Sequence, residues 1–535
     1  MKLILILLFL TSCSSFFKKE EPIFTLQILH TNDHHGHYLV DSKGQIGMAA
    51  RKTLVDNLRE EAAENNKFSL LLSGGDINTG TMESDYFNAE PDFKGMKKIG
   101  YDAMAVGNHE FDNDFETILK QRDWAGFPFL AANIFYKDSG KRVFDPAYLI
   151  KEHKGKKIGI FGLTTKDTPF KASHSDAKEK FLFKDITVVA KEIVKQLKDV
   201  EKVDYIIVTT HVGHYGSKTS NGDIDLAKEV DGIDVIVGGH SQEVIKADVY
   251  NDTIIVQAKD WGQYLGKLEI EVTEKKDIDR FSYDLIPVNL KKKVDGKRVF
   301  IRKEIPQDEE MQKLFEPFMK KAKIIGGKVV GKLDLTLSGN RKEVRSKQMA
   351  SAQFMMSAAK YKVPSIDIMI INGGSIRASL KAGNISRKNL HDMHPYGNAI
   401  AYVDFTKDEF FKHMEYMVKY LKVDKKFILG GYTHLYNMKV TLKDDKLAKI
   451  ESKDNKWSVE KNSSGKIISN KDKFRFATFN FSAKGGDDYP NITTHPSYVD
   501  TGFMINTAMM EYVENIRKIK AVKYRKMTSE IVLYK

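Results

Sequence analysis

Cysteine is almost absent from this chain, because Cys13 is the single cysteine among 535 residues. One cysteine cannot form an intramolecular disulfide, and it cannot supply the several thiolates of a structural zinc site. The fold must therefore depend on its hydrophobic core and on any metals that it binds. A metal site in this chain must use oxygen and imidazole nitrogen ligands.

Long apolar runs are also lacking. The N-terminal run Leu3–Leu10 has eight residues, whereas a transmembrane helix needs about 20. Residues 10–13, with the sequence LTSC, resemble a bacterial lipobox. We therefore expect a lipoprotein signal peptide over residues 1–12, a lipid on Cys13 and a tether over residues 13–23. Two acyl chains would anchor the protein stably. An ordinary secretory signal is the alternative.

The composition is that of a soluble globular protein, with 41% hydrophobic and 29% charged residues. The net charge of +13 would favour anionic ligands such as nucleotides. Lysine runs such as Lys291–Lys293 are more typical of solvated surfaces than of specific sites. No basic stripe interleaved with aromatic residues is present, so we predict that the protein does not bind nucleic acid.

The length of the chain predicts two domains, since one hydrophobic core rarely serves so many residues. In the first half, apolar runs alternate with amphipathic segments, which indicates a layered α/β fold. Residues 306–325 have the acidic start and basic end of a helix. We expect domains over residues 24–300 and 327–535, joined by a linker helix within residues 301–326.

Five short polar cassettes each follow an apolar run in the first half. They are TNDHHGH (Thr31–His37), SGGD (Ser73–Asp76), GNHEFD (Gly107–Asp112), THVGH (Thr210–His214) and GGHSQ (Gly238–Gln242). The carboxyl ends of strands in a layered α/β domain face one crevice, so these cassettes can converge. Their Asp, His, Asn and Gln side chains suit Zn, Mn or Fe. The pattern predicts a dinuclear metal centre.

The cassettes resemble those of the 5'-nucleotidase family, and in particular the bacterial 5'-nucleotidase/UDP-sugar hydrolase type. The second half shares the resemblance through NGGSIR (Asn372–Arg377), HPYGN (His394–Asn398) and NFSAKGGDDYP (Asn480–Pro490). The similarity extends from about Phe24 to near the C-terminus. It implies a four-layer calcineurin-like metallophosphoesterase sandwich, followed by a separate C-terminal domain of mixed α/β structure.

The resemblance implies two divalent metal ions, Zn, Mn or Co, with Asp76 as the bridging carboxylate. Asp33, His35 and Gln242 would complete the first metal site, and Asn108, His211 and His240 the second. Asp33 and His35 are two residues apart, as are His240 and Gln242. That spacing places both side chains on one side of an extended segment.

GNHEFD also carries the predicted catalytic pair. By the resemblance, His109 is a cation that stabilises the transition state, and Asp112 orients its ring and raises its basicity. A lone histidine is more often structural, but its position in this ordered set of cassettes favours catalysis. His34, His37 and His214 match no ligand position, so we assign them structural or supporting roles.

The second half would supply substrate specificity. The resemblance assigns terminal phosphate binding to Arg341, Arg345 and Arg377, nucleobase stacking to Tyr396 and Phe481, ribose binding to Asp487 and a base contact to Asn398. Arginine suits phosphate through its permanent charge and planar donor fork. Tyr396 departs from the phenylalanine of bacterial relatives, and its hydroxyl could alter substrate preference. The predicted metal ligands and the predicted nucleobase-stacking residues lie in different domains. We therefore expect a hinge near residues 306–327 that brings the two domains together.

We therefore expect an enzyme that hydrolyses nucleoside 5'-monophosphates to nucleoside and phosphate, through in-line attack by a metal-bridging hydroxide. Nucleotide diphosphates and UDP-sugars are further candidate substrates. The expected form is a monomer, lipid-anchored at a bacterial cell envelope, on the periplasmic face of a membrane or at the outer membrane.

Three alternatives stay open. They are a 2',3'-cyclic-nucleotide phosphodiesterase/3'-nucleotidase, a thiosulfohydrolase of the same superfamily and an inactive nucleotide-binding surface lipoprotein. In the first we expect leucine in place of His34. The presence of Asp76, His109 and Asp112 counts against the inactive protein.

Overall fold

The computed structural model describes residues 20–41, 43–172, 176–216, 220–276, 280–396, 398–421 and 431–534. The predicted signal peptide, Cys13 and most of the tether lie outside these residues. None of the helices in the described ranges has the length and apolar character that a membrane span requires.

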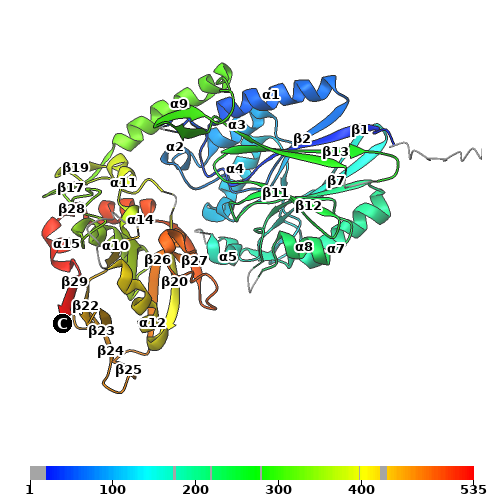
Figure 1. The fold of residues 1–535 in the computed structure, drawn as a ribbon. Helices are drawn as coiled ribbons and strands as arrows, with labels where there is room; N and C mark the ends of the chain where they lie inside the picture. Colours follow the sequence, from blue (N-terminus) through cyan, green and yellow to red (C-terminus); the bar gives the residue numbers. More distant parts are fainter. Residues whose placement is uncertain are drawn as a thin grey trace, which may run out of the picture.

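Two six-stranded sheets form the centre of the first domain (Figure 1). In spatial order, the first contains β14 (Phe281–Pro287), β13 (Tyr264–Val272), β1 (Phe24–Thr31), β2 (Lys67–Ser73), β3 (Ala103–Ala105) and β4 (Phe129–Leu130). The second contains β11 (Val244–Tyr250), β12 (Thr253–Ala258), β10 (Val235–Val237), β9 (Tyr205–His211), β7 (Lys156–Thr164) and β6 (Tyr148–His153). Strands β1 to β4 are parallel, as are β12, β10, β9 and β7. These strands include the five that the apolar runs predict.

Helices cover the outer face of each sheet. The first sheet is covered by α1 (Met48–Glu64), α3 (Glu90–Ile99) and α4 (Phe115–Ala125), and the second by α7 (Ile186–Gln196) and α8 (Asp223–Glu229). One core lies between the sheets, where Ile28 of β1 and Ile207 of β9 are fully buried. Separate cores lie under the helices of each face. This order of layers confirms the predicted four-layer sandwich.

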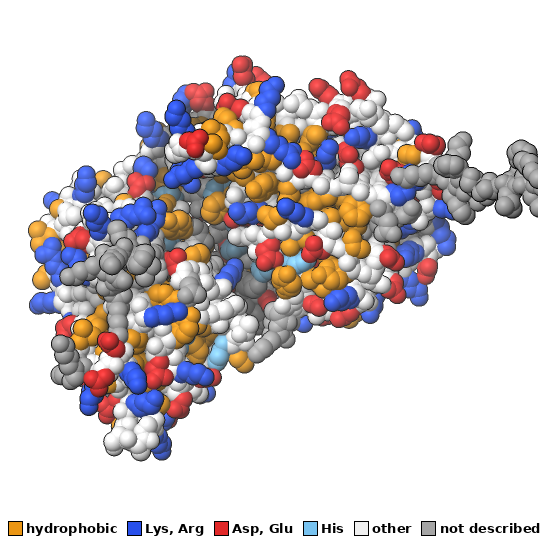
Figure 2. Space-filling model, in the orientation of Figure 1, with side chains coloured by type: hydrophobic (Ala, Val, Ile, Leu, Met, Phe, Trp, Pro, Cys, Tyr) orange, Lys and Arg blue, Asp and Glu red, His pale blue; other side chains and the backbone are white. Residues whose placement is uncertain are grey.

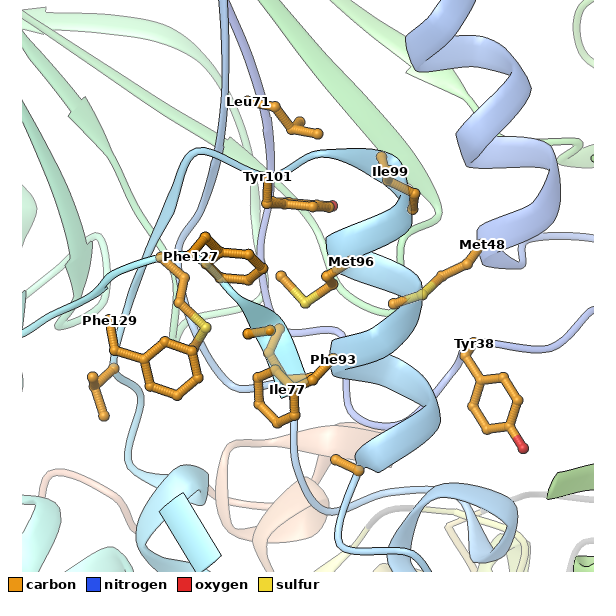
Figure 3. Packing of buried hydrophobic residues seen from close by; sticks show 14 of the residues in the cluster. Tyr38, Met48, Leu71, Ile77, Phe93, Met96, Ile99, Tyr101, Phe127 and Phe129 are labelled. Atoms are coloured by element: carbon orange, nitrogen blue, oxygen red, sulfur yellow. The ribbon is translucent and has the colours of Figure 1, made fainter. Parts of the chain in front are cut away.

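The helix α3 shows how one apolar face fills the outer core of the first sheet (Figure 3). Phe93, Met96 and Ile99 recur at helical spacing and are each at most 1% exposed. The Phe93 ring lies 5.5 Å from that of Phe129 at the end of the sheet. This packing fixes α3 directly behind the polar cassettes.

The remaining elements of the first domain are short. They are β5 (Ile134–Tyr136) paired with β8 (Phe181–Phe183), the hairpin β15 (Lys291–Val294) and β16 (Lys297–Phe300), and the helices α2 (Met82–Asp85), α5 (Thr168–Lys171) and α6 (Asp176–Glu179). The lysines of β15 are largely exposed, as expected for a solvated surface.

The predicted linker helix is α9 (Glu309–Gly327). Asp308 caps its N-terminus by accepting a hydrogen bond from Met311 N at 2.7 Å. The helix packs on α1 and α3, and the Phe315 ring meets the Tyr38 ring edge-on at 4.7 Å. In Figure 1, α9 crosses from the first domain to the second. The hinge that we expect near this helix stays a prediction.

The second domain contains three smaller sheets. They are β21 (Thr433–Leu435), β18 (Ile368–Asn372), β26 (Lys473–Phe479), β20 (Ala399–Thr406) and β27 (Val499–Met504); β25 (Ile467–Ser469), β24 (Ser458–Lys461), β23 (Lys446–Ser452), β22 (Met438–Lys443) and β29 (Glu530–Tyr534); and β19 (Gly383–Ser386), β17 (Val329–Leu333) and β28 (Lys518–Ile519). Its helices are α10 (Ala350–Lys362), α11 (Arg387–Met393), α12 (Lys407–Met417), α13 (Asn480–Ala483), α14 (Ile505–Ile516) and α15 (Ala521–Met527). In the methionine-rich α10, Met355 and Met356 are fully buried, so this helix fills the core.

The described residues of the two domains touch at several places. α5 packs against β27, and α9 packs against α11. The Arg387 guanidinium lies 5.2 Å from the centre of the Tyr86 ring, and it donates to Glu514 of its own domain at 2.7 Å. Figure 2 shows the surface hollowed between the two lobes. The Asp500 carboxylate of β27 is close enough to His109 to raise its pKa, so the GNHEFD cassette faces the second domain.

Buried histidine makes the second domain sensitive to acid. Burial lowers the pKa of His434 to about 4, although its Nε2–H donates to the Val344 carbonyl at 2.8 Å. The unfolded chain, with a histidine pKa of about 6.5, binds more protons in this interval. The contribution of the neutral His434 ring to the free energy of unfolding is therefore fully present above pH 6.5, and it is lost as the pH falls toward 4.

We predict a smaller acid effect in His434→Gln, which keeps an N–H donor but has no titrating ring. Between pH 7 and pH 5, its free energy of unfolding should fall by about 2 kcal/mol less than that of wild type. Urea unfolding at both pH values checks this, and equal losses would contradict it.

Candidate active site

The five polar cassettes converge at the carboxyl ends of the central strands. β1 leads directly into Asn32 and Asp33, β2 into the turn that carries Asp76, and β9 ends on His211. The Gly74 and Gly75 turn lies close against the neighbouring cassettes, because a Cβ at Gly74 would overlap the Gly238 carbonyl. Glycine therefore permits the cassettes to approach one another.

The predicted ligands of the first metal lie around His35 and Asp76. His35 Nε2 is 3.9 Å from Asp76 Oδ2 and 3.9 Å from Asp33 Oδ1. Gln242 Nε2 lies 2.9 Å from the same ring nitrogen. All four side chains that we predict for this metal therefore meet at one point.

The predicted ligands of the second metal lie around His211 and also include Asp76. His211 Nε2 is 2.9 Å from Asp76 Oδ2, 3.2 Å from Asn108 Oδ1 and 3.2 Å from His240 Nδ1. Asp76 therefore belongs to two possible metal-binding groups, one with His35 and His109 and one with His211 and His240. This is the position expected of a bridging carboxylate.

The histidine rings are oriented by backbone carbonyls behind the site. His35 Nδ1–H donates to the Thr79 carbonyl at 2.8 Å, and His211 Nδ1–H donates to the Gly74 carbonyl at 2.7 Å. Each bond leaves the Nε2 lone pair directed at the carboxylates. Hydrogen bonds of this kind are the usual support of metal-binding histidines.

The backbone of the ligands corrects one expectation from the sequence. Asp33 and His35 have φ angles of 49° each, and His240 and Gln242 have φ angles of 75° and 57°. These residues adopt left-handed turns, so the prediction of extended segments was wrong. Asp76, with a φ angle of 55°, belongs to the same class. Non-glycine residues rarely adopt this conformation, and it is concentrated at functional sites.

The donor set fits two divalent cations. The ring nitrogens of His211 and His240 face each other, and the Asp33 and Asp76 carboxylates are buried close by. Burial raises the pKa of Asp33 to about 7. Burial also opposes the charge on Asp76, but His211 and His109 outweigh it and lower its pKa well below the usual range. Electron-pair donors gathered in this way are stabilised by bound cations.

The predicted catalytic pair is formed beside the metal ligands. His109 Nδ1 lies 2.6 Å from Asp112 Oδ2, which also accepts from Thr79 Oγ1 at 2.5 Å. Burial disfavours the imidazolium of His109, but Asp112 and Asp76 outweigh it and raise the pKa of His109 to about 10. The carboxylate of Asp500, on β27 of the second domain, acts in the same direction. His109 is therefore held in its cationic form.

The predicted phosphate-binding residues gather in the second domain. Burial and the nearby charges of Arg341 and Arg377 lower the pKa of the Arg345 guanidinium. Three cations so close together favour a bound anion. The Arg377 guanidinium also lies 5.6 Å from the centre of the Tyr396 ring. The phosphate and base residues that the resemblance names are thus neighbours.

The other predicted substrate residues flank this group. The Phe481 side chain is 44% exposed, and it packs on Gly486, where a Cβ would overlap the ring. Asp487 accepts a hydrogen bond from Asn372 Nδ2 at 2.6 Å. Asn398 directly precedes β20, and its carbonyl accepts from Ile505 N at 3.1 Å. An aromatic face and a carboxylate are therefore available beside the arginines.

Comparison with known proteins decides the family. The profile of the calcineurin-like phosphoesterases matches residues 26–243, and that of the 5'-nucleotidase C-terminal domain matches residues 329–494. A 5'-nucleotidase of Vibrio parahaemolyticus is 40% identical over 94% of this chain and 91% of its own length. The chain belongs to the 5'-nucleotidase family. Protein UshA of Escherichia coli is 38% identical over 93% of this chain and 92% of its own.

Solved structures share the fold of this chain. The NAD nucleotidase of Haemophilus influenzae has a TM-score of 0.69 at 20% identity, over 96% of this chain and 99% of its own. A putative 5'-nucleotidase of Staphylococcus aureus has a TM-score of 0.63 at 16% identity, over 96% and 100%. Both likenesses span the two domains, so the two-domain architecture is shared.

Glu110 is a site residue that was not predicted from the sequence. Its buried carboxylate accepts from Gly107 N at 2.6 Å, Ile77 N at 2.7 Å, Asp76 N at 3.1 Å, Asn78 N at 3.3 Å and Asn78 Nδ2 at 3.1 Å. Glu110 thus connects the SGGD and GNHEFD cassettes. The one signal in the sequence was an acidic residue between His109 and an apolar phenylalanine.

We predict that Glu110→Gln destabilises the first domain by about 3 kcal/mol, because the amide places N–H donors opposite backbone N–H groups. Thermal unfolding of the metal-free protein measures this. Glu116→Gln on α4 is the matched control, since Glu116 is exposed. Equal unfolding temperatures for the two variants would show that the Glu110 contacts contribute nothing.

Proposed function

We propose that this enzyme hydrolyses nucleoside 5'-monophosphates to nucleoside and phosphate at a dinuclear metal centre. The supporting observation is that Asp76 lies between two groups of ligands, with the cationic His109 adjacent. Asp33, His35, Asp76 and Gln242 would hold one ion, and Asp76, Asn108, His211 and His240 the other. When bound, two Zn, Mn or Co ions would lower the pKa of the attacking water and neutralise charge on the phosphoryl group.

The residues of the chain contribute charge and orientation. The His109 cation would stabilise the negative charge that grows on the phosphoryl oxygens, a charge that water alone stabilises less well. Asp112 would hold the ring through its Nδ1–H, so that Nε2–H points toward the substrate. Because Asp112 is itself held by Thr79 Oγ1, the imidazolium needs no reorganisation during the reaction.

Substrate recognition is assigned to the second domain. Arg341, Arg345 and Arg377 would bind phosphate groups, and the same charge would accept the second phosphate of nucleotide diphosphates and UDP-sugars. Tyr396 and Phe481 would enclose the nucleobase, with Asn398 at its edge. Asp487 would accept hydrogen bonds from the ribose hydroxyls. Stacking on aromatic faces tolerates several bases.

We also propose a location. A lipid on Cys13 would keep the enzyme at the cell envelope. The described chain begins at Glu20, whose carbonyl accepts from Arg280 at 2.8 Å. A tether over residues 13–23 would leave the enzyme close to the lipid surface, and we propose that it acts there as a monomer.

The decisive experiment uses protein that begins at Lys18, stripped with chelator and reloaded separately with Mn, Co or Zn. We expect metal-dependent phosphate release from AMP, and a fall of about 10²- to 10³-fold in kcat for His109→Ala. Parallel assays with 3'-AMP, 2',3'-cyclic AMP and UDP-glucose measure which other phosphate esters the enzyme hydrolyses. Faster release from the 2',3'-cyclic nucleotide than from AMP would favour the phosphodiesterase alternative. Absence of release from any substrate by metal-loaded protein would refute the proposal.

Base stacking gives a second prediction. Tyr396→Ala should raise KM for AMP by about 5- to 150-fold, because one stacking face contributes about 1–3 kcal/mol. Tyr396→Phe keeps the ring and should leave KM for AMP near wild type. Tyr416→Ala removes a tyrosine that is 44% exposed on α12 and serves as the control. An unchanged KM in Tyr396→Ala would place the base elsewhere.

A further inference from the structure

A fully buried polar network lies behind the first cassette. Its members are Arg51 of α1, His34 of the cassette and Asp92 of α3, each at most 1% exposed. None of them is among the metal or substrate residues proposed above. Ionisable side chains are seldom buried so completely unless their contacts serve a purpose.

The contacts determine which nitrogen of His34 carries the proton. Arg51 Nη2 lies 3.4 Å from His34 Nδ1, and an arginine side chain has donors only. Nδ1 must therefore accept, and the proton resides on Nε2. That nitrogen lies 3.1 Å from Asp92 Oδ1. The neutral imidazole thus lies between the Arg51 guanidinium and the Asp92 carboxyl group, within 3.4 Å of the first and 3.1 Å of the second.

The network continues into β1, α2 and the loop between α3 and β3. Arg51 Nη1 donates to the Tyr101 hydroxyl at 3.4 Å, and this hydroxyl lies 2.7 Å from Thr31 Oγ1 at the end of β1. On the other side, Ser84 Oγ of α2 donates to Asp92 Oδ2 at 2.6 Å. Figure 3 shows Tyr101 packed beside the apolar residues of α3. His34 is therefore fixed to elements that do not themselves carry ligands.

The neighbours of His34 in the chain need such support. Asp33 and His35 both adopt left-handed φ angles of 49°, which cost about 1–2 kcal/mol per residue. The Arg51 guanidinium occupies the space beside Gly262, where a Cβ would overlap it. The adjacent Trp261 N donates to the Asp33 carbonyl at 2.8 Å. The turn that carries Asp33 and His35 is thus held by the network through His34 and by Trp261, whose neighbour Gly262 lies next to Arg51.

We propose that His34, held between Arg51 and Asp92, is a positioning residue for the first metal site. It fixes the turn that presents Asp33 and His35, and its own side-chain partners are Arg51 of α1 and Asp92 of α3. The proposal rests on the metal ligands assigned above. Its distinctive consequence is selectivity, because loss of His34 weakens one metal site and leaves the other intact.

The test is titration of chelator-stripped protein with Mn²⁺, followed by calorimetry, so that activity is not the readout. Wild type should bind two ions. In His34→Leu, we expect the affinity of one site to fall by about 10- to 100-fold and the other to stay unchanged. His34→Gln should restore both, because its amide oxygen accepts from Arg51 and its N–H donates to Asp92.

The matched control is His30→Leu. His30 is equally buried, on β1 of the same chain segment, and its Nε2 lies 3.1 Å from the Tyr283 hydroxyl. This variant should lose stability but keep both metal affinities. If His34→Leu does not fold, His34→Asn replaces it, since the shorter amide cannot span Arg51 and Asp92.

The outcomes separate this inference from the proposed function. Unchanged affinities at both sites in the folded leucine or asparagine variant would overturn the positioning role while leaving the metal centre intact. Equal weakening of both sites would also overturn it. Failure of wild type to bind Mn²⁺ at all would instead refute the ligand assignment itself.

Discussion

The loops of the first domain are organised around the buried carboxylate of Asp76. It is 2% exposed, and its Oδ2 lies 3.9 Å from His35 Nε2 and 2.9 Å from His211 Nε2. A buried negative charge is tolerated only where cations and N–H donors surround it. The two sheets meet this requirement because the loops that follow five of their strands bring polar side chains together around Asp76. The layers of the domain can be understood as the scaffold for that convergence.

The two domains carry site residues of opposite electrostatic character. The first gathers carboxylates and imidazoles, a donor set for cations, whereas the second gathers the arginines, a donor set for anions. A phosphate ester between them meets complementary charge on both sides. Contact between α5 and β27 brings the domains together beside His109. A substrate that carries both a phosphate and an aromatic base suits this arrangement.

Much of this architecture could be predicted from the sequence. Apolar runs identified the strands, and the polar cassettes that follow them identified the residues that the structure brings together, because both signals are local. Glu110 was missed because its role is to accept backbone N–H groups from two cassettes, and no spacing rule reports that. The left-handed turns at Asp33 and His240 were missed for a related reason. Backbone conformation there is imposed by tertiary contacts, of which the His34 network is one.

The left-handed turns also bear on how the site was assembled. Their conformation is fixed by hydrogen bonds and packing within the protein, such as the bond from Trp261 N to the Asp33 carbonyl. Contacts within the folded chain therefore hold the candidate ligands in place. Ions bound there as proposed above would lose little affinity to rearrangement of the chain. The folded backbone would then take part in the choice between metals of different preferred coordination.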